Sequence, residues 1–592
     1  MFRLKFYAAM FAVIIGLLTT FNQTARAQAC VTNPVVVNNL DSGAGSLRNA
    51  VIDVCSGGTI SFSASMPPEV SLTTGQIVIN KNNLTIQGPG ADRLTIRNGA
   101  SSRIFQVNGG LTISGLTIED GTASGIFNPG TLTVADCVVR SNKGTGIFNS
   151  GNLTVVNSVL SDNEGGHGGA IHNTGTAAIT NSTILHNSAK IGGGIYSNNS
   201  VTITNSSITG NTATGELLPN GNVFTRLIWG SAILNENGRA TITNSTIAGN
   251  DDLGFAYEHC YIGYPTRTCP AGYGTAILVL SNSQGGQAVE LNLINSTVTD
   301  NILIKKFSDT PASVTARNSI INGVGGDGVP TSLGYNLFVN NANGGITGDT
   351  TGNPRLGPLG YYGGRAMTRP LLTGSPAINA GNTATSPAAD QRGASRVGAA
   401  DIGAFELNNS ANGGNFVVPL PDAFTEIAYS QLLVEGTAGF TYSLTGGALP
   451  TGISLSRSQS SRVTVSGRTA QTGVFAFSVT ATEGTNSFVT NYSIRVLPSG
   501  APPFGGCRSN VVVANRSDAG EGTLRQAVFD VCAGGTISFS EAARGKIHLT
   551  GGPLAINKNL TIAGPGADAL TLRSAVGSGP KNNVVLVNPG VT

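Results

Sequence analysis

The fold is decided by the stretch Leu153–Asn163, which reads LTVVNSVLSDN. Apolar residues alternate with polar ones before an asparagine turn, which is typical of a short, half-buried strand. Outward along the chain, the pattern returns at a period of 21 to 24 residues wherever no insertion interrupts it. The copies are Leu132–Asn142, Ala177–Asn187, Val201–Asn211 and Ala240–Asn250, with weaker ones at Leu291–Asn301 and Val314–Asn322. One unit cannot bury its own apolar face, so the repeats predict stacked coils in a parallel β-solenoid.

Stacked coils place equivalent residues above one another, which predicts two columns. The first column is apolar, points inward and comprises Ile126, Ile147, Ile171, Ile195, Ile233 and Ile277. The second comprises Asn142, Asn163, Asn187, Asn211 and Asn250. These asparagines are expected at turns, where Asn tolerates the left-handed backbone region and can hydrogen-bond the neighbouring coil. Insertions at about 212–230 and 251–275 predict loops that leave one side of the solenoid.

The composition supports an all-β chain and excludes several classes of protein. Glycine accounts for 81 of 592 residues and only 11% of residues are charged, unlike a helical bundle. Hydrophobic residues make up 40% of the chain, which is too many for a disordered protein. The 34 basic and 31 acidic side chains leave a net charge of +3 with no basic stripe. We therefore expect no nucleic-acid partner.

The N-terminus predicts export. Residues 1–29 combine Arg3 and Lys5 with an apolar run and a small-residue cleavage site, so they are typical of a signal peptide. No later run approaches the roughly 18 apolar residues that a membrane-spanning helix needs. We therefore expect a mature chain without a transmembrane helix, located at the cell surface, at the outer membrane or outside the cell.

Cysteine spacing predicts a disulfide-bonded, exported protein. The first two cysteines are 25 residues apart, and the last two repeat that spacing in a duplicated segment. The expected pairs are Cys30–Cys55, Cys260–Cys269 and Cys507–Cys532. Cys137 is expected to remain a buried, inert thiol, because the neighbouring repeats have serine at its position. Lipidation of Cys30 is the alternative interpretation, and the copy of this cysteine in mid-chain argues against it.

A short helix is expected at Ser46–Val54, with Ser46 as its N-cap, covering the open end of the solenoid. The segments around it are Asp41–Ala50, which reads DSGAGSLRNA, and Leu84–Asp92, which reads LTIQGPGAD. They resemble the opening of bacterial right-handed parallel β-helix surface proteins with a CSLREA-like start. The resemblance implies a right-handed coil of the pectate-lyase-like fold group, which includes polysaccharide lyases and hydrolases.

Residues 331–407 resemble the choice-of-anchor Q domain that ends such helices. The motifs that carry this resemblance are Leu333–Leu337, Gly374–Gly381, Asp390–Gly393 and Asp401–Glu406. The charged residues Asp390, Arg392, Asp401 and Glu406 lie in a glycine-rich segment. They predict ion pairs that hold a C-terminal cap against the last coil of a solenoid spanning residues 30–330. A site for a cation or a partner is the alternative.

The period changes after the cap. Residues 416–497 contain short strands separated by turn signals, which predicts a small β-sandwich. This segment resembles the Ig-like modules of bacterial surface proteins through Ala428–Ser430, Ala448–Ile453 and Val465–Arg468. Residues 498–506 are expected to form a linker. Residues 507–592 copy the beginning of the solenoid and predict the start of a second, incomplete β-helix, either truncated or completed by something outside this sequence.

No catalytic set emerges from the sequence. Gly166-His167-Gly168 resembles a polygalacturonase motif and Asp251-Asp252 resembles the paired carboxylates of those enzymes, but their order along the chain is reversed. His167 also aligns with Ile191, in a turn. The cysteine and histidine spacing fits no zinc site. We therefore expect no cofactor, no metal site and no cleavage that depends on His167, Asp251 or Asp252.

The residues after the isoleucine column are candidates for binding, because strand alternation turns them to the outer face. Phe127, Phe148, His172 and Tyr196 would then stack at the strand separation of about 4.8 Å, where they can hold sugar rings or an apolar partner surface. Burial beneath an adjoining loop is the alternative.

Two classes of function fit the sequence. The first is an exported, noncatalytic bacterial surface or secreted protein that presents a repetitive β-helix face for adhesion or for contact with glycans or other envelope components. The second is a carbohydrate-active enzyme, a lyase or hydrolase of the pectate-lyase-like fold. A polar, uncharged face favours the first, and acids clustered with Arg or Lys in a groove favour the second.

Overall fold

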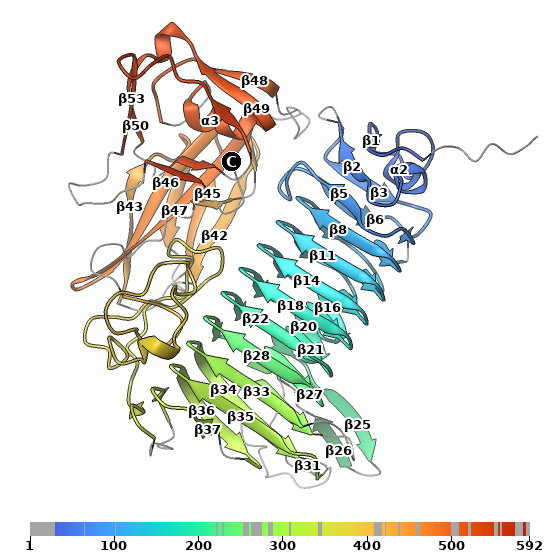
Figure 1. Cartoon of the computed structure of the whole chain (residues 1–592), viewed down its shortest axis with the longest axis vertical. Helices are drawn as coiled ribbons and strands as arrows, with labels where there is room; N and C mark the ends of the chain where they lie inside the picture. The colour runs from blue at the N-terminus through green and yellow to red at the C-terminus, as the bar shows by residue number, and fades with distance from the viewer. Residues whose placement is uncertain are drawn as a thin grey trace, which may run out of the picture.

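The structure is a computed structural model of the 592-residue chain. It describes residues 30–587 with gaps at 64–65, 101, 221–222, 228–229, 253–259, 262–274, 282–287, 307–308, 329, 341–345, 408–416, 421, 436–438, 458–461, 499–507, 519–521, 550–553, 557–558 and 575–583. Figure 1 shows a long solenoid that carries the N-terminal part of the chain, with the C-terminal part folded back beside it.

The solenoid is built from two long sheets in which each strand pairs in parallel with the equivalent strand of the next coil. The first sheet comprises β1 (Val35–Val36), β2 (Thr59–Phe62), β5 (Leu84–Gln87), β8 (Gly110–Ser114), β11 (Thr131–Ala135), β14 (Asn152–Val156), β18 (Thr176–Thr180), β22 (Val201–Thr204), β28 (Arg239–Thr243), β33 (Val289–Ile294), β35 (Ala312–Arg317) and β37 (Thr331–Ser332). Its face follows the whole length of the solenoid in Figure 1.

The second sheet has shorter strands, two per coil in most coils. It comprises β3 (Glu69–Leu72), β4 (Ile77–Ile79), β6 (Thr95–Asn98), β7 (Phe105–Val107), β9 (Thr117–Glu119), β10 (Ser124–Asn128), β12 (Val138–Arg140), β13 (Thr145–Asn149), β15 (Val159–Ser161), β17 (Ile171–Asn173), β19 (Thr183–Leu185), β21 (Ile195–Ser197), β23 (Ser207–Thr209), β27 (Ile233–Glu236), β29 (Thr246–Ala248), β32 (Thr275–Ser281), β34 (Thr297–Lys306), β36 (Ile320–Gly326), β38 (Leu337–Phe338) and β39 (Thr350–Thr351). The strands reach Thr351, so the solenoid extends beyond the expected boundary at residue 330.

Both predicted columns are present. The six isoleucines pair in register from coil to coil and are fully buried. The asparagines form a chain of side-chain hydrogen bonds, in which each Nδ2 from Asn142 to Asn211 donates to the next Oδ1 at 2.7–2.9 Å. The prediction that these asparagines adopt the left-handed backbone region is wrong. That geometry occurs before them, at Ser141, Asp162 and His186, and at the other turn in a second asparagine series that includes Asn157 and Asn181.

The N-terminal end is closed as predicted. Helix α2 (Leu47–Asp53) begins after Ser46, whose side chain accepts a hydrogen bond from the backbone N–H of Asn49. Cys30 and Cys55 form a disulfide bond, and Cys137 is a free, buried thiol. The other expected pairs lie outside the described residues, because Cys269 and Cys507 are not described.

A third, small sheet begins where the coils lengthen. Its strands are β16 (Glu164–His167), β20 (Ser188–Ile191), β24 (Thr212–Ala213) and β30 (Asp251–Asp252). The insertion after β24 contains the antiparallel strands β25 (Glu216–Asn220) and β26 (Val223–Leu227), and the next insertion contributes β31 (Cys260–Tyr261). These segments are therefore partly β-hairpin rather than loop throughout.

After the last coil, the chain turns back along the flank of the solenoid. We call residues 354–407 the strap. Its Ala404 N–H donates to Thr297 Oγ1 at 3.0 Å, and its Arg365 reaches Asp136 at 3.1 Å, several coils nearer the N-terminus. The segment packs against the last coils, where Leu371, Ala377 and Ile402 contact Ile320 and Leu337, and it extends beyond the expected cap as a strap along many coils. A short 3-10 helix, η1 (Thr383–Thr385), lies within it.

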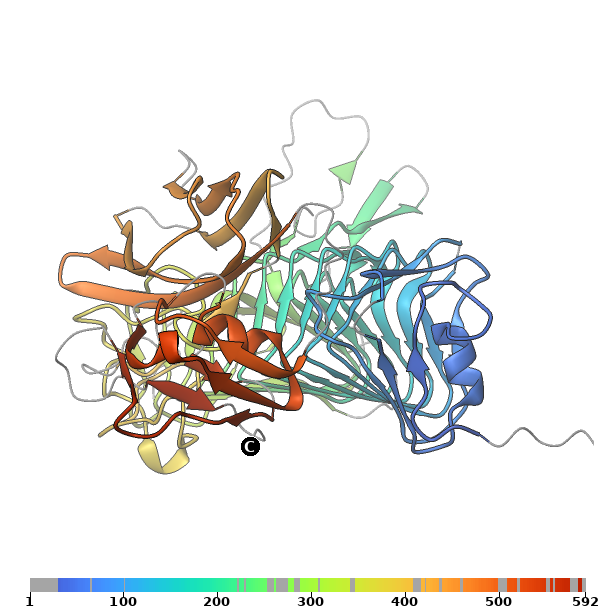
Figure 2. The same cartoon turned by 90° about the horizontal axis from the view of Figure 1, so that it is seen from above.

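The remaining chain forms a sandwich and a small last module, both beside the flank of the solenoid (Figure 2). The sandwich strands are β40 (Val417–Pro419), β41 (Ala423–Phe424), β42 (Tyr429–Glu435), β43 (Thr441–Gly447), β44 (Ile453–Arg457), β45 (Arg462–Gly467), β46 (Gly473–Glu483) and β47 (Asn486–Leu497). Most pair antiparallel, and one sandwich residue, Arg495, bonds Asp422 at 2.7 Å and reaches Asp92 of the solenoid at 3.7 Å.

The last module repeats the beginning of the solenoid. It comprises β48 (Arg508–Val513), α3 (Leu524–Asp530), β49 (Val531–Phe539), η2 (Glu541–Ala543), β50 (Gly545–Leu549), β51 (Leu554–Ile556), β52 (Thr561–Ile562), β53 (Leu570–Ser574) and β54 (Val585–Val587). Its strands pair in parallel, and the ion pair Arg525–Asp518 at 2.7 Å reproduces Arg48–Asp41 at 2.6 Å.

Candidate functional site

A row of rings lies on the outer face of the second sheet. We call Phe127, Phe148, His172 and Tyr196 the aromatic strip; they occupy equivalent positions in β10, β13, β17 and β21 and pair in register. Successive ring centroids are 5.4, 4.4 and 4.8 Å apart. The rings alternate with the buried isoleucines, as strand geometry requires. Sequence reasoning thus placed these residues on one line.

Two neighbours extend the strip. The guanidinium of Arg103 lies 4.8 Å from the ring of Phe127, within cation–π range. The exposed ring of His167, at the end of β16, lies 5.5 Å from His172 and 5.2 Å from Tyr196. Sequence reasoning left both outside the site. The alignment of His167 with Ile191 in the sequence could have placed His167 beside the strip, because the structure pairs these two residues on neighbouring strands.

The four rings of the strip are uncharged at neutral pH, whereas the guanidinium of Arg103 beside Phe127 is positive. Burial, with the nearby His167, lowers the pKa of His172 to about 4, so this ring is uncharged. Burial also raises the pKa of Tyr196 well above its usual value, and Tyr196 Oη donates to Glu236 Oε2 at 2.6 Å. Phe127, Phe148 and His172 are half-buried, whereas Tyr196 is only 7% exposed. The column of rings is thus partly covered at Phe127, Phe148 and His172 and buried at Tyr196, so binding by these residues stays a prediction.

The outer face of the first sheet is polar and uncharged over much of its length. From β5 to β22 its strands contain no charged residue, and threonines recur at the outward positions. Thr85, Thr112, Thr133 and Thr154 pair in register across four strands. Such a face offers hydroxyl groups but no acid or base.

The sequence motifs of hydrolases are not brought together. β30, with Asp251 and Asp252, lies three strands from β16 in the third sheet, which is roughly 14 Å at the usual strand spacing. Asp251 pairs through Thr212 and Ser188 with Glu164, not with His167. Within the described part of the chain, no group of three or more His, Cys, Asp or Glu residues is placed to hold a metal ion.

Charged residues do gather on the strands near the N-terminal end, but as a cross-strand ladder. Arg97 contacts Glu69, Glu119 and Asp120, and Arg140 pairs with the same Glu119 at 2.9 Å. The two arginines are 36% and 46% exposed, so this is a solvated face on which opposite charges alternate from strand to strand.

The charged residues predicted in the strap are buried, and their charges are paired with other residues of the strap. Asp390 and Arg392 pair at 2.7 Å with no exposed side-chain surface, and Glu406 pairs with Arg396 at 3.0 Å. Asp401 instead accepts the backbone N–H groups of Asn379 and Leu407, each at 2.6 Å, and burial raises its pKa to about 6. The expected ion pairing of Asp401 is thus corrected. The partner that the sequence reasoning missed is Arg396.

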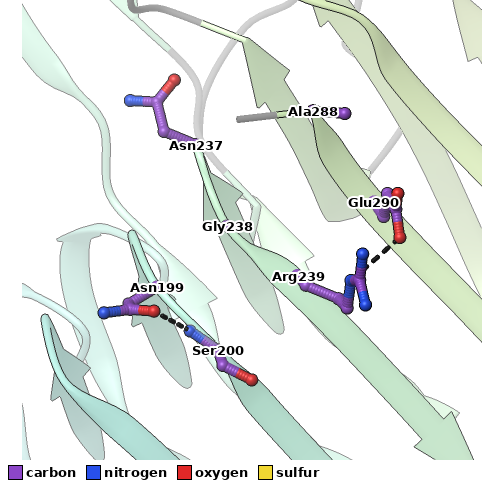
Figure 3. A pocket seen from close by; sticks show the side chains of 7 residues that line it. All are labelled: Asn199, Ser200, Asn237, Gly238, Arg239, Ala288 and Glu290. Carbon is purple, nitrogen blue, oxygen red and sulfur yellow. Dashed lines mark hydrogen bonds and ion pairs between the residues drawn. The ribbon is translucent and has the colours of Figure 1, made fainter. Parts of the chain in front are cut away.

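A shallow hollow lies at the turns between the two long sheets (Figure 3). Its volume is about 520 Å³, and its lining includes Asn199, Asn237, Arg239 and Glu290. Arg239 and Glu290 pair at 2.9 Å, and the Arg239 side chain is 65% exposed. Arg239 and Glu290 thus neutralise each other in the hollow. No ring of the aromatic strip lines the hollow.

Comparison with known proteins identifies one part of the chain. Residues 407–497, which include the sandwich, match the family model He_PIG, described as "Putative Ig domain". The curated proteins contain no match to this chain. In the described residues, no helix is long and apolar enough to cross a membrane. The fold and this match define a parallel β-solenoid protein with an Ig-like domain.

Three solved structures show low similarity to this chain. The endo-fucoidan hydrolase MfFcnA4, of glycoside hydrolase family 107, is 20% identical over 17% of this chain and 16% of its own length, with a TM-score of 0.13. ORF18 of Geobacillus virus E2 is 11% identical over 81% and 77% of the chains, with a TM-score of 0.31. The PL6 family alginate lyase AlyGC is 12% identical over 92% and 68%, with a TM-score of 0.27.

Proposed function

We propose that this chain is an exported, noncatalytic bacterial surface or secreted protein whose solenoid binds a neutral glycan along the aromatic strip. The observation that carries the proposal is the row of half-buried rings Phe127, Phe148 and His172, in edge-to-face and tilted contact with centroids 5.4 and 4.4 Å apart on the outer face of the second sheet. Sugar rings present apolar C–H faces, and a row of half-buried rings offers a matching apolar surface.

The uncharged faces of the solenoid support a binding role without catalysis. Acid–base cleavage of a glycosidic bond needs two carboxyl groups flanking that bond, about 5–9.5 Å apart. The strands of the first sheet from β5 to β22 contain no charged residue, and Asp251 pairs along the third sheet with Glu164 rather than with His167. The acids near the N-terminal end are instead matched to arginines.

Export is supported by the leader-like residues 1–29 and by the Cys30–Cys55 bond. It also rests on the resemblance of Asp41–Ala50 and Leu84–Asp92 to a CSLREA-like start and of residues 331–407 to a choice-of-anchor Q domain. Expression of the full chain in a bacterium, followed by fractionation and N-terminal sequencing, tests it. We expect a mature N-terminus at Gln28 or Cys30 outside the cytoplasm; uncleaved cytoplasmic protein would contradict export.

Glycan binding is tested by affinity electrophoresis of the mature protein in gels that contain xylan, laminarin or hydroxyethylcellulose. The test variant is Phe127→Ser with Phe148→Ser, because both rings are half-buried; Tyr196 is avoided because it belongs to the core. At about 0.5–1.5 kcal/mol per ring contact, the loss of two rings costs about 1–3 kcal/mol of binding free energy, which weakens binding roughly 5- to 150-fold.

The matched control is Thr133→Ala with Thr154→Ala, which changes the same two coils on the first sheet. We expect this control to bind as the parent does. No retardation of the parent by any of the three glycans, or equal retardation of both variants, would contradict the proposal. Release of sugar fragments by the parent, abolished by His167→Ala, would support the enzyme alternative instead.

A further inference from the structure

The aromatic strip is open at one end and covered at the other. The outward column that starts at Phe127 continues in register through Tyr196 to Leu234 in β27 and Leu278 in β32. Exposure falls along it: the first three rings are half-buried, Tyr196 is 7% exposed, Leu234 is fully buried and Leu278 is 2% exposed. A flat ligand can therefore follow the column from Phe127 only as far as His172, because Tyr196 in the next coil is already buried.

A change in coil length causes this difference. The asparagine column advances by 21 residues from Asn142 to Asn163, but by 24 from Asn163 to Asn187. The additional residues allow the third sheet to begin at β16, immediately beside the strip. The shorter coils of Phe127 and Phe148 have no such strand. The strip is thus open where the coils are short and flanked where they are long.

The third sheet forms a wall over the far end of the strip. Its residue His167 contacts the rings of His172 and Tyr196, and the next residue of the same column, Ile191, packs against the cluster of Tyr196, Leu234 and the leucines of β32. In the following coil, β24 continues the third sheet as far as Ala213, and the chain then enters the antiparallel hairpin of β25 and β26 before it rejoins the second sheet at β27. The wall therefore runs along the coils in which the exposure of the column falls.

Polar groups lie at the closed end. Tyr196 Oη donates to Glu236 Oε2 at 2.6 Å, and both residues project from the outer face of the second sheet, where the rings end. A carboxylate accepts hydrogen bonds from sugar hydroxyl groups, and it repels a uronic acid at the same place. Charge complementarity thus favours an uncharged sugar with free hydroxyl groups at this position.

We propose, building on the proposed function, that the strip receives the end of a neutral glycan chain, with the terminal sugar on His172, where the buried Tyr196 and its partner Glu236 end the accessible rings, and the preceding sugars along Phe148 and Phe127. A site that bound the middle of a chain would need an exit beyond Tyr196. The buried leucines occupy that path. The strip therefore distinguishes chain ends from chain interiors.

The test compares a short and a long fraction of the same xylan, laminarin or hydroxyethylcellulose, whichever retards the parent protein. Binding is measured by isothermal titration calorimetry at equal sugar mass. Chain-end recognition predicts that the number of sites per unit mass rises in proportion to the number of chain ends. Binding along the chain predicts nearly equal values for the two fractions.

Glu236→Gln is the matching variant, with Glu290→Gln as the control carboxylate in the hollow. We expect Glu236→Gln to weaken binding at least tenfold and the control to bind as the parent does, with the circular dichroism melting curve reporting whether each variant folds. If Glu236→Gln does not fold, the comparison of the two fractions decides alone. Equal sites per mass, or unchanged binding by folded Glu236→Gln, overturns the chain-end inference but leaves glycan binding standing. Absence of binding by the parent overturns the proposed function itself.

Discussion

Replacement of Asn187 by alanine is the sharpest test of how the solenoid is held together. Asn187 Oδ1 accepts the backbone N–H of Asn163 at 3.1 Å and its Nδ2 at 2.8 Å. Asn187 Nδ2 donates to Leu160 O at 2.9 Å and to Asn211 Oδ1 at 2.9 Å. All these side chains are buried, so water does not replace the lost partner without entering the core.

The magnitude follows from the groups left behind. Asn187→Ala leaves two donors of Asn163, its backbone N–H and one N–H of its side chain, without this acceptor. Each buried group that loses its partner costs about 1–3 kcal/mol, which gives about 2–6 kcal/mol in the free energy of unfolding. Asn152→Ala is the matched control. The exposed side chain of Asn152 accepts a hydrogen bond from the Thr176 hydroxyl in the neighbouring coil, and its backbone carbonyl keeps the bond from Asn128 Nδ2 after the substitution, so the change should cost about 0.5 kcal/mol.

The assay is urea unfolding followed by circular dichroism, with both variants measured beside the parent. The Asn187→Ala midpoint should fall well below that of Asn152→Ala. If the two variants unfold at the same midpoint with the same slope, the hydrogen-bonded column contributes nothing that an exposed asparagine does not, and the reasoning is refuted.

Three further predictions concern other parts of the molecule. Cys55→Ser should lower the stability of the N-terminal cap by about 3 kcal/mol, seen as faster hydrogen exchange in α2; unchanged exchange would count against a structural role of the bond. The pKa of His172 in the folded protein lies below its ordinary value, so as the pH falls the unfolded chain takes up the proton first. The free energy of unfolding should therefore be highest above pH 6.5 and should decline as the pH falls to about 4. His172→Phe should flatten this pH dependence, and an unaltered slope would refute the assignment. Arg392→Met leaves the buried carboxylate of Asp390 without its partner and should cost about 3–5 kcal/mol, measured by calorimetry; an unchanged Tm would contradict the buried pair.

Periodic features were predictable from the sequence because each coil interacts with its immediate neighbours. Ile147 and Phe148 occupy alternate faces of β13, as the pattern of apolar residues indicated. The asparagine column was also predictable, but not its backbone geometry. The left-handed residues precede the column, at positions occupied by Ser141 and Asp162, so residue type alone did not identify them.

Contacts between distant segments were not predictable in the same way. The strap contact between Arg365 and Asp136 joins residues 229 apart, and no repeat relates them. The burial of Tyr196 likewise depends on how the lengthened coils fold over the strip, which a pattern of alternating residues does not encode. The pairing of Arg396 with Glu406 was missed because the arginine lies outside the motifs that carried the resemblance.

The strap changes how the molecule can come apart. A bare solenoid behaves as a one-dimensional array, in which the terminal coil frays first and the next one follows. Here the segment that leaves the last coil is fastened to coils far upstream, at Thr246 by a hydrogen bond to Gln391 Oε1 at 2.6 Å and at Asp136 by an ion pair at 3.1 Å. The C-terminal coil therefore cannot unfold alone, because the strap that follows it must first lose its contacts with the upstream coils. The solenoid and the strap should accordingly melt as one cooperative unit, and a pulling force applied to the sandwich is shared among several coils at once.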